Sequence, residues 1–568
     1  MPRVNDTPHN VAQTLRETAR RFPAQRGVVA PVGRDRQGRV QYRQLSFAEL
    51  DHESDCLAAG LIDLGVSPGD RLVLAVKPGI EFIALTYAVF RARGTLVLID
   101  PGMGPRRVFG CLDQVDPAGF LGLPLVQALR VLNGRRFAQS RYNVTVGSPQ
   151  WCPRWLSGTT HHQLRARGEQ VLANAGERWI WPDTHPTDPA AIIFTSGSTG
   201  PPKGVVYEHG MFRAQVDLLR EFYGLEPGGA DVPGFPLFGL FNAALGVTTV
   251  IPDMDASRPA RVDPRRILEA IERNNATQGF GSPAIWNRVG AYCSDRQITL
   301  PTLQRVFSAG APVPERVLRQ MSATLTQPGA SMHTPYGATE ALPVASISAR
   351  EVLEETVSAT RQGAGTCVGR LFPQMELRIL AISDDPLPRW SDVRELPPGE
   401  IGEIVVRGPV VTREYFALPQ ATTLAKIADG DTFWHRMGDV GYLDPQGRLW
   451  FCGRKSQRVE TAAGPLFTDQ VEPVFNTHPQ IFRSALVGVG PRPRQRPVLV
   501  VELAEGARWT AALREELLAL GASVATTRQV QSLLPHPGPL PVDVRHNTKI
   551  NREALAVWAN PRVAAVVD

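Results

Sequence analysis

Residues 195–204 have the sequence Thr195-Ser196-Gly197-Ser198-Thr199-Gly200-Pro201-Pro202-Lys203-Gly204 and directly follow an apolar run, Ala191-Ile192-Ile193-Phe194. We therefore expect a buried strand that ends in a loop of hydroxyls and glycines. Small residues let successive backbone N–H groups turn toward one point, which suits a polyphosphate. Lys203 adds a compact positive charge, and it is one of only five lysines among 61 basic residues. A plain Gly/Ser surface loop is the alternative interpretation.

This loop differs from the Walker phosphate loop, in which the lysine and a Ser/Thr lead straight into a helix. Here Pro201 and Pro202 precede Lys203 and are incompatible with such a helix. The complete string instead resembles the phosphate loop of the adenylate-forming superfamily, which contains acyl-CoA synthetases, peptide-synthetase adenylation domains and luciferases. The resemblance implies ATP and Mg²⁺ as cofactors. It also implies that Thr195, Ser196, Gly197, Ser198, Thr199, Gly200 and Lys203 bind the nucleotide.

The bulk composition favours a large soluble enzyme. The chain has 568 residues, of which 43% are hydrophobic and 20% charged, so about four domain-sized units with ample cores are expected. A net charge of +6 is small for this length and argues against nucleic acid as a partner, while it leaves anionic substrates or a membrane surface open. Six dispersed cysteines without metal spacing indicate buried thiols in a reducing compartment. No signal peptide or spanning segment is evident, so we expect a cytoplasmic protein.

The order of the expected elements divides the chain near Gly453. Residues 71–76, 80–93 and 95–99 have the pattern of a strand, a helix and a strand, which predicts a βαβ unit and a covered parallel sheet. Residues 399–408 alternate polar and apolar side chains, as in a short antiparallel barrel. After Gly453 a separate helix (510–520) and strands (485–489, 498–503) are expected. Residues 141–190 show no clear periodicity, and we expect an irregular excursion there.

With the resemblance, these segments predict an α/β fold in two parts. Residues 1–453 would form the AMP-binding adenylation domain, a large N-terminal domain of αβ subdomains with a small β-barrel. Residues 454–568 would form a smaller, mobile α+β C-terminal domain that acts as a lid.

The segment Tyr336-Gly337-Ala338-Thr339-Glu340 resembles the adenine and magnesium motif of the superfamily. Tyr336 could stack on a purine, Thr339 could donate to a phosphoryl oxygen, and Glu340 could hold Mg²⁺ through hard oxygen ligands. Upstream, Ser308-Ala309-Gly310-Ala311-Pro312 resembles the small-residue loop beside the adenine, which implies nucleotide contacts for Gly310, Ala311 and Pro312. Taken alone, either segment would be interpreted as an ordinary turn.

The segment 434–442 resembles the ribose motif of the same superfamily. It precedes a hairpin signal, Asp444-Pro445-Gln446-Gly447. Asp439 lies beside a glycine and could accept hydrogen bonds from two vicinal ribose hydroxyls, and a charged acceptor makes such bonds about twice as strong as neutral pairs. Next, Gly453-Arg454-Lys455-Ser456 resembles the linker on which the small domain rotates. Arg454 would contact ribose or phosphate, and Ser456 takes the pivot position, where relatives usually carry Asp or Lys. The alternative for both segments is turn chemistry.

Lys549 lies where most relatives deliver a lysine to the substrate carboxylate and the α-phosphate, although Thr548 replaces the usual preceding glycine. Attack of a carboxylate on the α-phosphorus brings two anions together. The main catalytic requirement is therefore charge neutralisation and alignment. The resemblance thus implies Lys549 and Glu340 as the catalytic residues. Without it, Lys549 would be interpreted as a solvated lysine.

Two departures put thioester formation in doubt. Gly239 replaces the histidine that many acyl-CoA synthetases carry after Pro-Leu-Phe, and residues 458–464 lack the Lys-Val-x-Gly spacing that opens a pantetheine tunnel. The segments 98–104 and 545–550 instead resemble the β-lactone synthetase branch of bacterial long-chain olefin biosynthesis. That branch adenylates a long-chain 2-alkyl-3-hydroxy acid, whose own hydroxyl then displaces AMP. Proximity favours this closure, because the hydroxyl is tethered to the activated acyl group.

The expected function is therefore β-lactone formation from a long-chain β-hydroxy acid. A long-chain fatty acyl-CoA or acyl-AMP ligase is the second interpretation, and a non-catalytic nucleotide-binding scaffold is the third. The resemblance leaves open an assembly with other enzymes of the same lipid pathway. His209 and His333 flank motifs, but the sequence identifies neither as the base for the hydroxyl.

Overall fold

The computed structural model describes residues 10–147, 158–195, 200–542 and 550–564. These residues divide into two compact units. Unit 1 contains residues 1–281, 300–306 and 409–422, and unit 2 contains residues 282–299, 307–408 and 423–568. Elements β13 (Arg305–Ser308) and α15 (Pro419–Ala425) contain boundaries between these segments.

Unit 1 contains a seven-stranded sheet in the order β7-β6-β5-β3-β4-β8-β9. Its strands are β3 (Arg71–Ala75), β4 (Thr95–Leu98), β5 (Gly119–Gly122), β6 (Tyr142–Thr145), β7 (Thr159–Thr160), β8 (Pro189–Phe194) and β9 (Gly204–Glu208). All neighbouring strands are parallel except β8 and β9, which are antiparallel. The predicted βαβ unit is confirmed, because helix α3 (Ile80–Arg91) connects β3 to β4. Strands of a parallel sheet are buried on both faces. This is why their sequences are continuous hydrophobic runs with no polar alternation.

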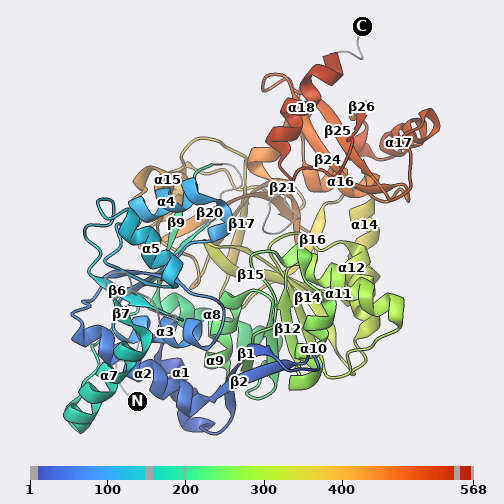
Figure 1. Ribbon diagram of the computed structural model, residues 1–568. Helices are drawn as coiled ribbons and strands as arrows, with labels where there is room; N and C mark the ends of the chain where they lie inside the picture. The colour runs from blue at the N-terminus through green and yellow to red at the C-terminus, as the bar shows by residue number, and fades with distance from the viewer. Residues whose placement is uncertain (1–9, 148–157, 196–199, 543–549, 565–568) are drawn as a thin grey trace. The chain divides into compact units, whose positions relative to one another are not determined.

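A second group of strands in unit 1 has the order β12-β10-β11-β1-β2. Its members are β1 (Arg26–Arg34), β2 (Val40–Ser46), β10 (Ala230–Pro233), β11 (Thr248–Val250) and β12 (Gln278–Gly281). In the described part of unit 1 the other α-helices are α1 (Gln13–Arg21), α2 (Phe47–Asp63), α4 (Pro105–Val115), α5 (Pro124–Leu132), α7 (His161–Ala175), α8 (His209–Tyr223), α9 (Gly239–Leu245) and α10 (Pro264–Asn274). Helix α2 packs against α1, α3 and α7 (Figure 1).

The expectation of an irregular segment over residues 141–190 is wrong. The segment contains β6, β7 and the fifteen-residue helix α7, whose N-terminus is capped by the Thr160 side chain. Helix α7 lies against α2 at a point where both backbones approach closely, since a Cβ at Gly168 would overlap the carbonyl oxygen of Cys56. This contact is made by glycine and backbone. It therefore left little apolar periodicity in the sequence to detect.

Unit 2 contains an antiparallel run of strands in the order β17-β18-β20-β21-β16-β15-β14, with β19 beside β20. They are β14 (Ser331–Ala338), β15 (Ala341–Ser348), β16 (Thr366–Leu371), β17 (Glu376–Leu380), β18 (Gly402–Arg407), β19 (Lys426–Asp429), β20 (Thr432–Leu443) and β21 (Leu449–Arg454). The antiparallel strand expected over 399–408 is confirmed as β18. Helices α11 (Pro283–Arg296), α12 (Glu315–Thr324), α13 (Ala349–Glu351) and α14 (Val357–Arg361) accompany these strands.

The part of unit 2 after Gly453 has apolar clusters of its own. Its elements are β22 (Val459–Thr461), β23 (Gly464–Leu466), α16 (Thr468–Phe475), β24 (Ile481–Val489), β25 (Arg496–Leu503), α17 (Ala511–Ser523), β26 (Ser532–Pro535) and α18 (Arg552–Ala564). Strands β24, β25 and β26 form one sheet, with one apolar cluster around Phe475 and Leu517 and another around Leu555 and Ala559. This α+β arrangement confirms the expected secondary structure of the C-terminal part. The boundary at residue 453 stays a prediction.

Candidate functional site

In unit 1 the glycine-rich loop joins two strands that run side by side. Strand β8 ends at Phe194 and β9 begins at Gly204, and the two residues are paired in antiparallel register. The loop is closed at its base by a hydrogen bond of 3.0 Å from the Thr195 backbone N–H to the Lys203 carbonyl. The predicted strand-to-loop transition is confirmed. The two ends of the loop therefore lie next to each other at the same edge of the sheet.

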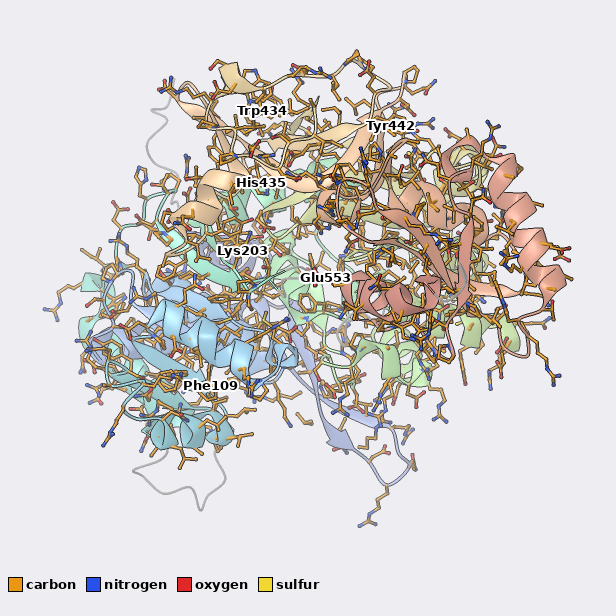
Figure 2. The ribbon with its side chains drawn as sticks, turned by 90° about the horizontal axis from the view of Figure 1, so that it is seen from above. Phe109, Lys203, Trp434, His435, Tyr442 and Glu553 are labelled. Atoms are coloured by element: carbon orange, nitrogen blue, oxygen red, sulfur yellow. The ribbon has the colours of Figure 1, made fainter. Side chains whose placement is uncertain are left out.

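Lys203 is positioned by an aromatic ring from a distant part of unit 1. Its Nζ lies 4.7 Å from the centre of the Tyr415 ring (Figure 2). The segment around Tyr415 runs along β9, because Val205 and Tyr415 form an isolated antiparallel bridge and the Phe416 N–H donates to the Gly204 carbonyl at 2.7 Å. A cation near an aromatic face is attracted electrostatically by the ring. Lys203 is therefore held as an oriented point charge at the end of the loop.

Several predicted site residues lie outside the described residues. They are Ser196, Gly197, Ser198 and Thr199 of the loop, and Lys549. Their assigned contacts stay predictions.

In unit 2 the predicted adenine and ribose residues meet. Asp439 is 2% exposed, and its Oδ2 accepts a hydrogen bond of 2.6 Å from the Tyr336 hydroxyl. The guanidinium of Arg454 lies 2.8 Å from Asp439 Oδ1. Burial, together with the Asp439 carboxylate, raises the pKa of Tyr336 well above its usual value, and Asp439 raises the pKa of Arg454. The phenol therefore remains a donor and the guanidinium a cation over the physiological pH range.

Local strand geometry explains why these side chains converge. Strands β20 and β21 form the hairpin predicted at residues 444–447, and Asp439 is directly paired with Arg454 across it. Side chains of directly paired residues leave the same face of an antiparallel sheet and lie close together. Gly438 has φ +67°, a conformation that L-residues rarely adopt, so the glycine before Asp439 is required by the turn of the chain.

The other motif residues lie at strand ends of unit 2. Gly337 and Ala338 end β14, and Thr339 and Glu340 form the connection to β15. Gly310, Ala311 and Pro312 follow β13, as expected for a loop after a strand. Gly310 has φ +95°, which makes glycine the favoured residue there.

A lysine near Glu340 was not identified as a site residue from the sequence. The Nζ of Lys426, the first residue of β19, lies 3.1 Å from Nδ1 of the buried His435 on β20 (Figure 2). Burial lowers the pKa of Lys426 to about 7, and the Glu340 carboxylate opposes this shift. The rarity of lysine in the chain was the one feature of the sequence that could have drawn attention to Lys426. Its contact with His435 could not be predicted, because it depends on the pairing of β19 with β20.

The two histidines considered as bases have different surroundings. His209 is 1% exposed, its Nδ1 accepts a hydrogen bond of 3.2 Å from the Val11 N–H, and its ring lies edge-on to Phe90. Burial lowers the pKa of His209 to about 4. This histidine therefore has a structural role in the core of unit 1. His333 lies on β14 with its ring 5.8 Å from that of Phe307.

The described residues contain no group of three or more His, Cys, Asp or Glu side chains able to hold a metal ion. A magnesium ion that accompanies ATP does not need such a group. It usually keeps several waters and binds one or two carboxylates together with the phosphates. The single carboxylate of Glu340 fits this donor set.

Within the described residues, no helix has the length and apolar character needed to cross a bilayer.

Comparison with known proteins places the chain in a family. The profile of the AMP-binding enzyme family matches residues 15–416. An olefin beta-lactone synthetase from Xanthomonas campestris is 48% identical over 97% of this chain and 97% of that protein. Another olefin beta-lactone synthetase, from Stenotrophomonas maltophilia, is 49% identical over 97% of this chain and 98% of that protein.

A solved structure shows the same fold at lower identity. The amide bond synthetase McbA from Marinactinospora thermotolerans has a TM-score of 0.75 and 23% identity, covering 97% of this chain and 100% of that chain. The family match covers most of the chain, and the two relatives each match 97% of it. This chain therefore belongs to the AMP-binding enzyme family, together with the olefin beta-lactone synthetases that resemble it over almost their whole length.

Proposed function

We propose that this protein adenylates a long-chain 2-alkyl-3-hydroxy acid with ATP and closes the product to a β-lactone, releasing pyrophosphate and AMP. The observation that carries the proposal is the 48–49% identity, over 97% of the chain, to two proteins named olefin beta-lactone synthetase. The chemical class of the acid comes from the resemblance of residues 98–104 and 545–550 to that branch.

The arrangement around Asp439 supports the nucleotide half of this proposal. Asp439 would accept hydrogen bonds from the ribose hydroxyls, Tyr336 would lie against the adenine, and Arg454 would contact ribose or phosphate. The 2.6 Å and 2.8 Å contacts of Asp439 hold its carboxylate in one orientation before the nucleotide binds. Such preorganisation reduces the entropy lost on binding. Lys203 would contact the phosphates and Glu340 would hold Mg²⁺, which neutralises phosphate charge when it is bound.

The proposed reaction has two steps, transfer of the adenylyl group to the carboxylate and transfer of the acyl group to the 3-hydroxyl. A carboxylate oxygen of the acid attacks the α-phosphorus and pyrophosphate leaves, with Lys549 proposed to neutralise the charge that develops. The 3-hydroxyl oxygen next attacks the acyl carbon and AMP leaves with the bonding electrons. The hydroxyl proton is lost in this step, so the product is the acid minus one water. The tethered nucleophile needs no second substrate site.

The surroundings of Gly239 favour lactone closure over thioester formation. Gly239 begins α9, and a Cβ built there would lie 3.0 Å from Cγ2 of Thr249 and 3.2 Å from Cγ of Pro233. A histidine at this position, as in many acyl-CoA synthetases, would require both neighbours to move. The close packing around Gly239 is therefore compatible with glycine and unfavourable for the histidine of many acyl-CoA synthetases.

The segment after the linker also differs from the sequence expected of a coenzyme A enzyme. Residues 459–466 form the β22–β23 hairpin, and Arg458 at its start is ion-paired with Asp384 and Glu460. This side chain is thus engaged where acyl-CoA synthetases have the lysine of the Lys-Val-x-Gly segment.

The test is to incubate the protein with ATP and a long-chain 3-hydroxy acid, with and without coenzyme A. The proposal predicts that AMP release needs the hydroxy acid and is unchanged by coenzyme A. AMP release that depends on coenzyme A and yields a thioester would establish the acyl-CoA ligase interpretation. Absence of any carboxylate-dependent pyrophosphate exchange would favour the scaffold interpretation.

A further inference from the structure

Helix α5 exposes a continuous apolar stripe. Its inner face is anchored by Gln127, which is fully buried and donates hydrogen bonds of 3.1 Å to the carbonyls of Phe120 and Val144. On the outer face Leu125 is 70% exposed, Leu129 44% and Leu132 81%. The spacing i, i+4, i+7 places these three side chains on one side of the helix. Single exposed leucines are common, but three aligned on one helix form an apolar patch of the kind that marks an interaction site.

The chain around this stripe is rich in arginine. Residues 105–141 contain six arginines and two aspartates, and no lysine, glutamate or histidine. Arg106, Arg107 and Arg135 are exposed, and no carboxylate of the described residues lies within ion-pair distance of them. An excess of positive charge therefore accompanies the leucines.

Helix α4, which carries Arg106 and Arg107, is packed in the same layer as α5. Arg136, just after α5, forms a 2.7 Å ion pair with Asp113 of α4, and its guanidinium lies 5.0 Å from the centre of the Phe109 ring. Phe109 and Phe137 stack with their ring centres 6.3 Å apart, and residues of α4 and α5 belong to one apolar cluster that includes both rings. Helix α5, which carries the leucine stripe, is thus packed against α4, which carries Arg106 and Arg107, and Arg135 directly precedes the residue that links the two helices.

We propose that this docking face, formed by Leu125, Leu129, Leu132, Arg106, Arg107 and Arg135, binds the surface of a bilayer that contains anionic lipids. Leucines of an interfacial helix enter the boundary between headgroups and acyl chains, while arginines meet the lipid phosphates. The positive charge is what selects this occupant over a neutral apolar partner. Docking at a bilayer would also bring the enzyme to the phase where a long-chain acid concentrates, although the proposal does not depend on the proposed function.

The experiment is flotation of the full-length protein with vesicles of phosphatidylcholine alone or mixed with phosphatidylglycerol. We expect binding to the mixed vesicles that weakens as salt is added, because exposed charges are screened. The variant Leu125→Ala/Leu129→Ala/Leu132→Ala keeps good helix formers and is expected to bind about tenfold more weakly. The variant Arg106→Gln/Arg107→Gln/Arg135→Gln should lose its preference for the anionic vesicles.

The matched control is Ile180→Ala, which removes a side chain that is 86% exposed elsewhere in unit 1. It should bind as the unmodified protein does. The thermal unfolding midpoint of each variant, compared with that of the unmodified protein, checks that it is folded. The proposal is overturned if the unmodified protein does not float with anionic vesicles, or if the leucine variant floats equally well. A self-association that is lost in the leucine variant, without vesicle binding, would instead assign the face to a second copy of this chain.

Discussion

The hydroxyl of Tyr336 donates a 2.6 Å hydrogen bond to Oδ2 of Asp439, which lies 103 residues further along the chain. Arg454 holds the other oxygen of the same carboxylate at 2.8 Å. Two motifs that are distant in sequence are therefore joined at one buried anion. The orientation of this carboxylate is set by the protein and does not depend on the nucleotide.

Asp439→Ala should weaken the use of ATP more than any other change in this cluster. Loss of a preorganised charged acceptor is expected to raise the KM for ATP and to lower kcat/KM by about 10²-fold. Carboxylate-dependent pyrophosphate exchange at varied ATP measures both quantities. Asp429→Asn is the control, since Asp429 pairs with Arg407 in the same run of strands. An unchanged KM for ATP in Asp439→Ala would remove the ribose role of this residue.

Lys549→Ala should stop activation of the acid while ATP still binds. The assigned ammonium acts on the reacting centre, and its loss is expected to cost about 10²–10³ in the rate of adenylation. Pyrophosphate exchange reports the rate, and calorimetry reports ATP binding. Lys77→Ala removes an exposed lysine and serves as the matched control. Equal turnover of Lys549→Ala and Lys77→Ala would contradict the role given to Lys549.

His209 should make the protein less stable as the pH falls below about 6.5. The folded state holds this imidazole neutral with a pKa of about 4, whereas its ordinary value is 6.5. The unfolded chain therefore binds the proton first, and stability is lost between these two values, by about 1.4 kcal/mol per pH unit. His209→Gln keeps an acceptor for the Val11 N–H but does not titrate.

The measurement is the difference in urea midpoint between the unmodified protein and His209→Gln at pH 7 and at pH 5. The variant should lose less stability on acidification. Parallel losses in both proteins would show that His209 does not titrate in this range.

Glu403→Gln should destabilise unit 2 strongly. Glu403 has a side chain that is 1% exposed, and it lies 2.7 Å from Arg436 and 2.9 Å from Lys455. Removing the carboxylate leaves two cations without this anion, which typically costs about 3–5 kcal/mol. The thermal unfolding midpoint checks this. Glu376→Gln, which breaks an exposed pair with Arg407, should change it little; similar shifts in the two variants would contradict the expectation.

The sequence predicted the strands of the βαβ unit and the β20–β21 hairpin because their signals are local: apolar runs, alternation and turn residues. It also selected Tyr336, Asp439 and Arg454 from recognisable motifs, and the structure brings these three side chains together, while their roles toward a nucleotide stay predictions. It did not predict α7, whose packing against α2 is made by glycines and leaves few apolar positions. Nor did it find the contact of Lys426 with His435, which depends on the register of two strands.

The most direct test of β-lactone formation is the mass of the product formed from one long-chain 2-alkyl-3-hydroxy acid and ATP, without coenzyme A. Lactone closure predicts a product that is lighter than the acid by one water, accompanied by equal amounts of AMP and pyrophosphate. Recovery of the unchanged acid, or of an acyl-adenylate that persists until coenzyme A converts it to a thioester, would contradict it.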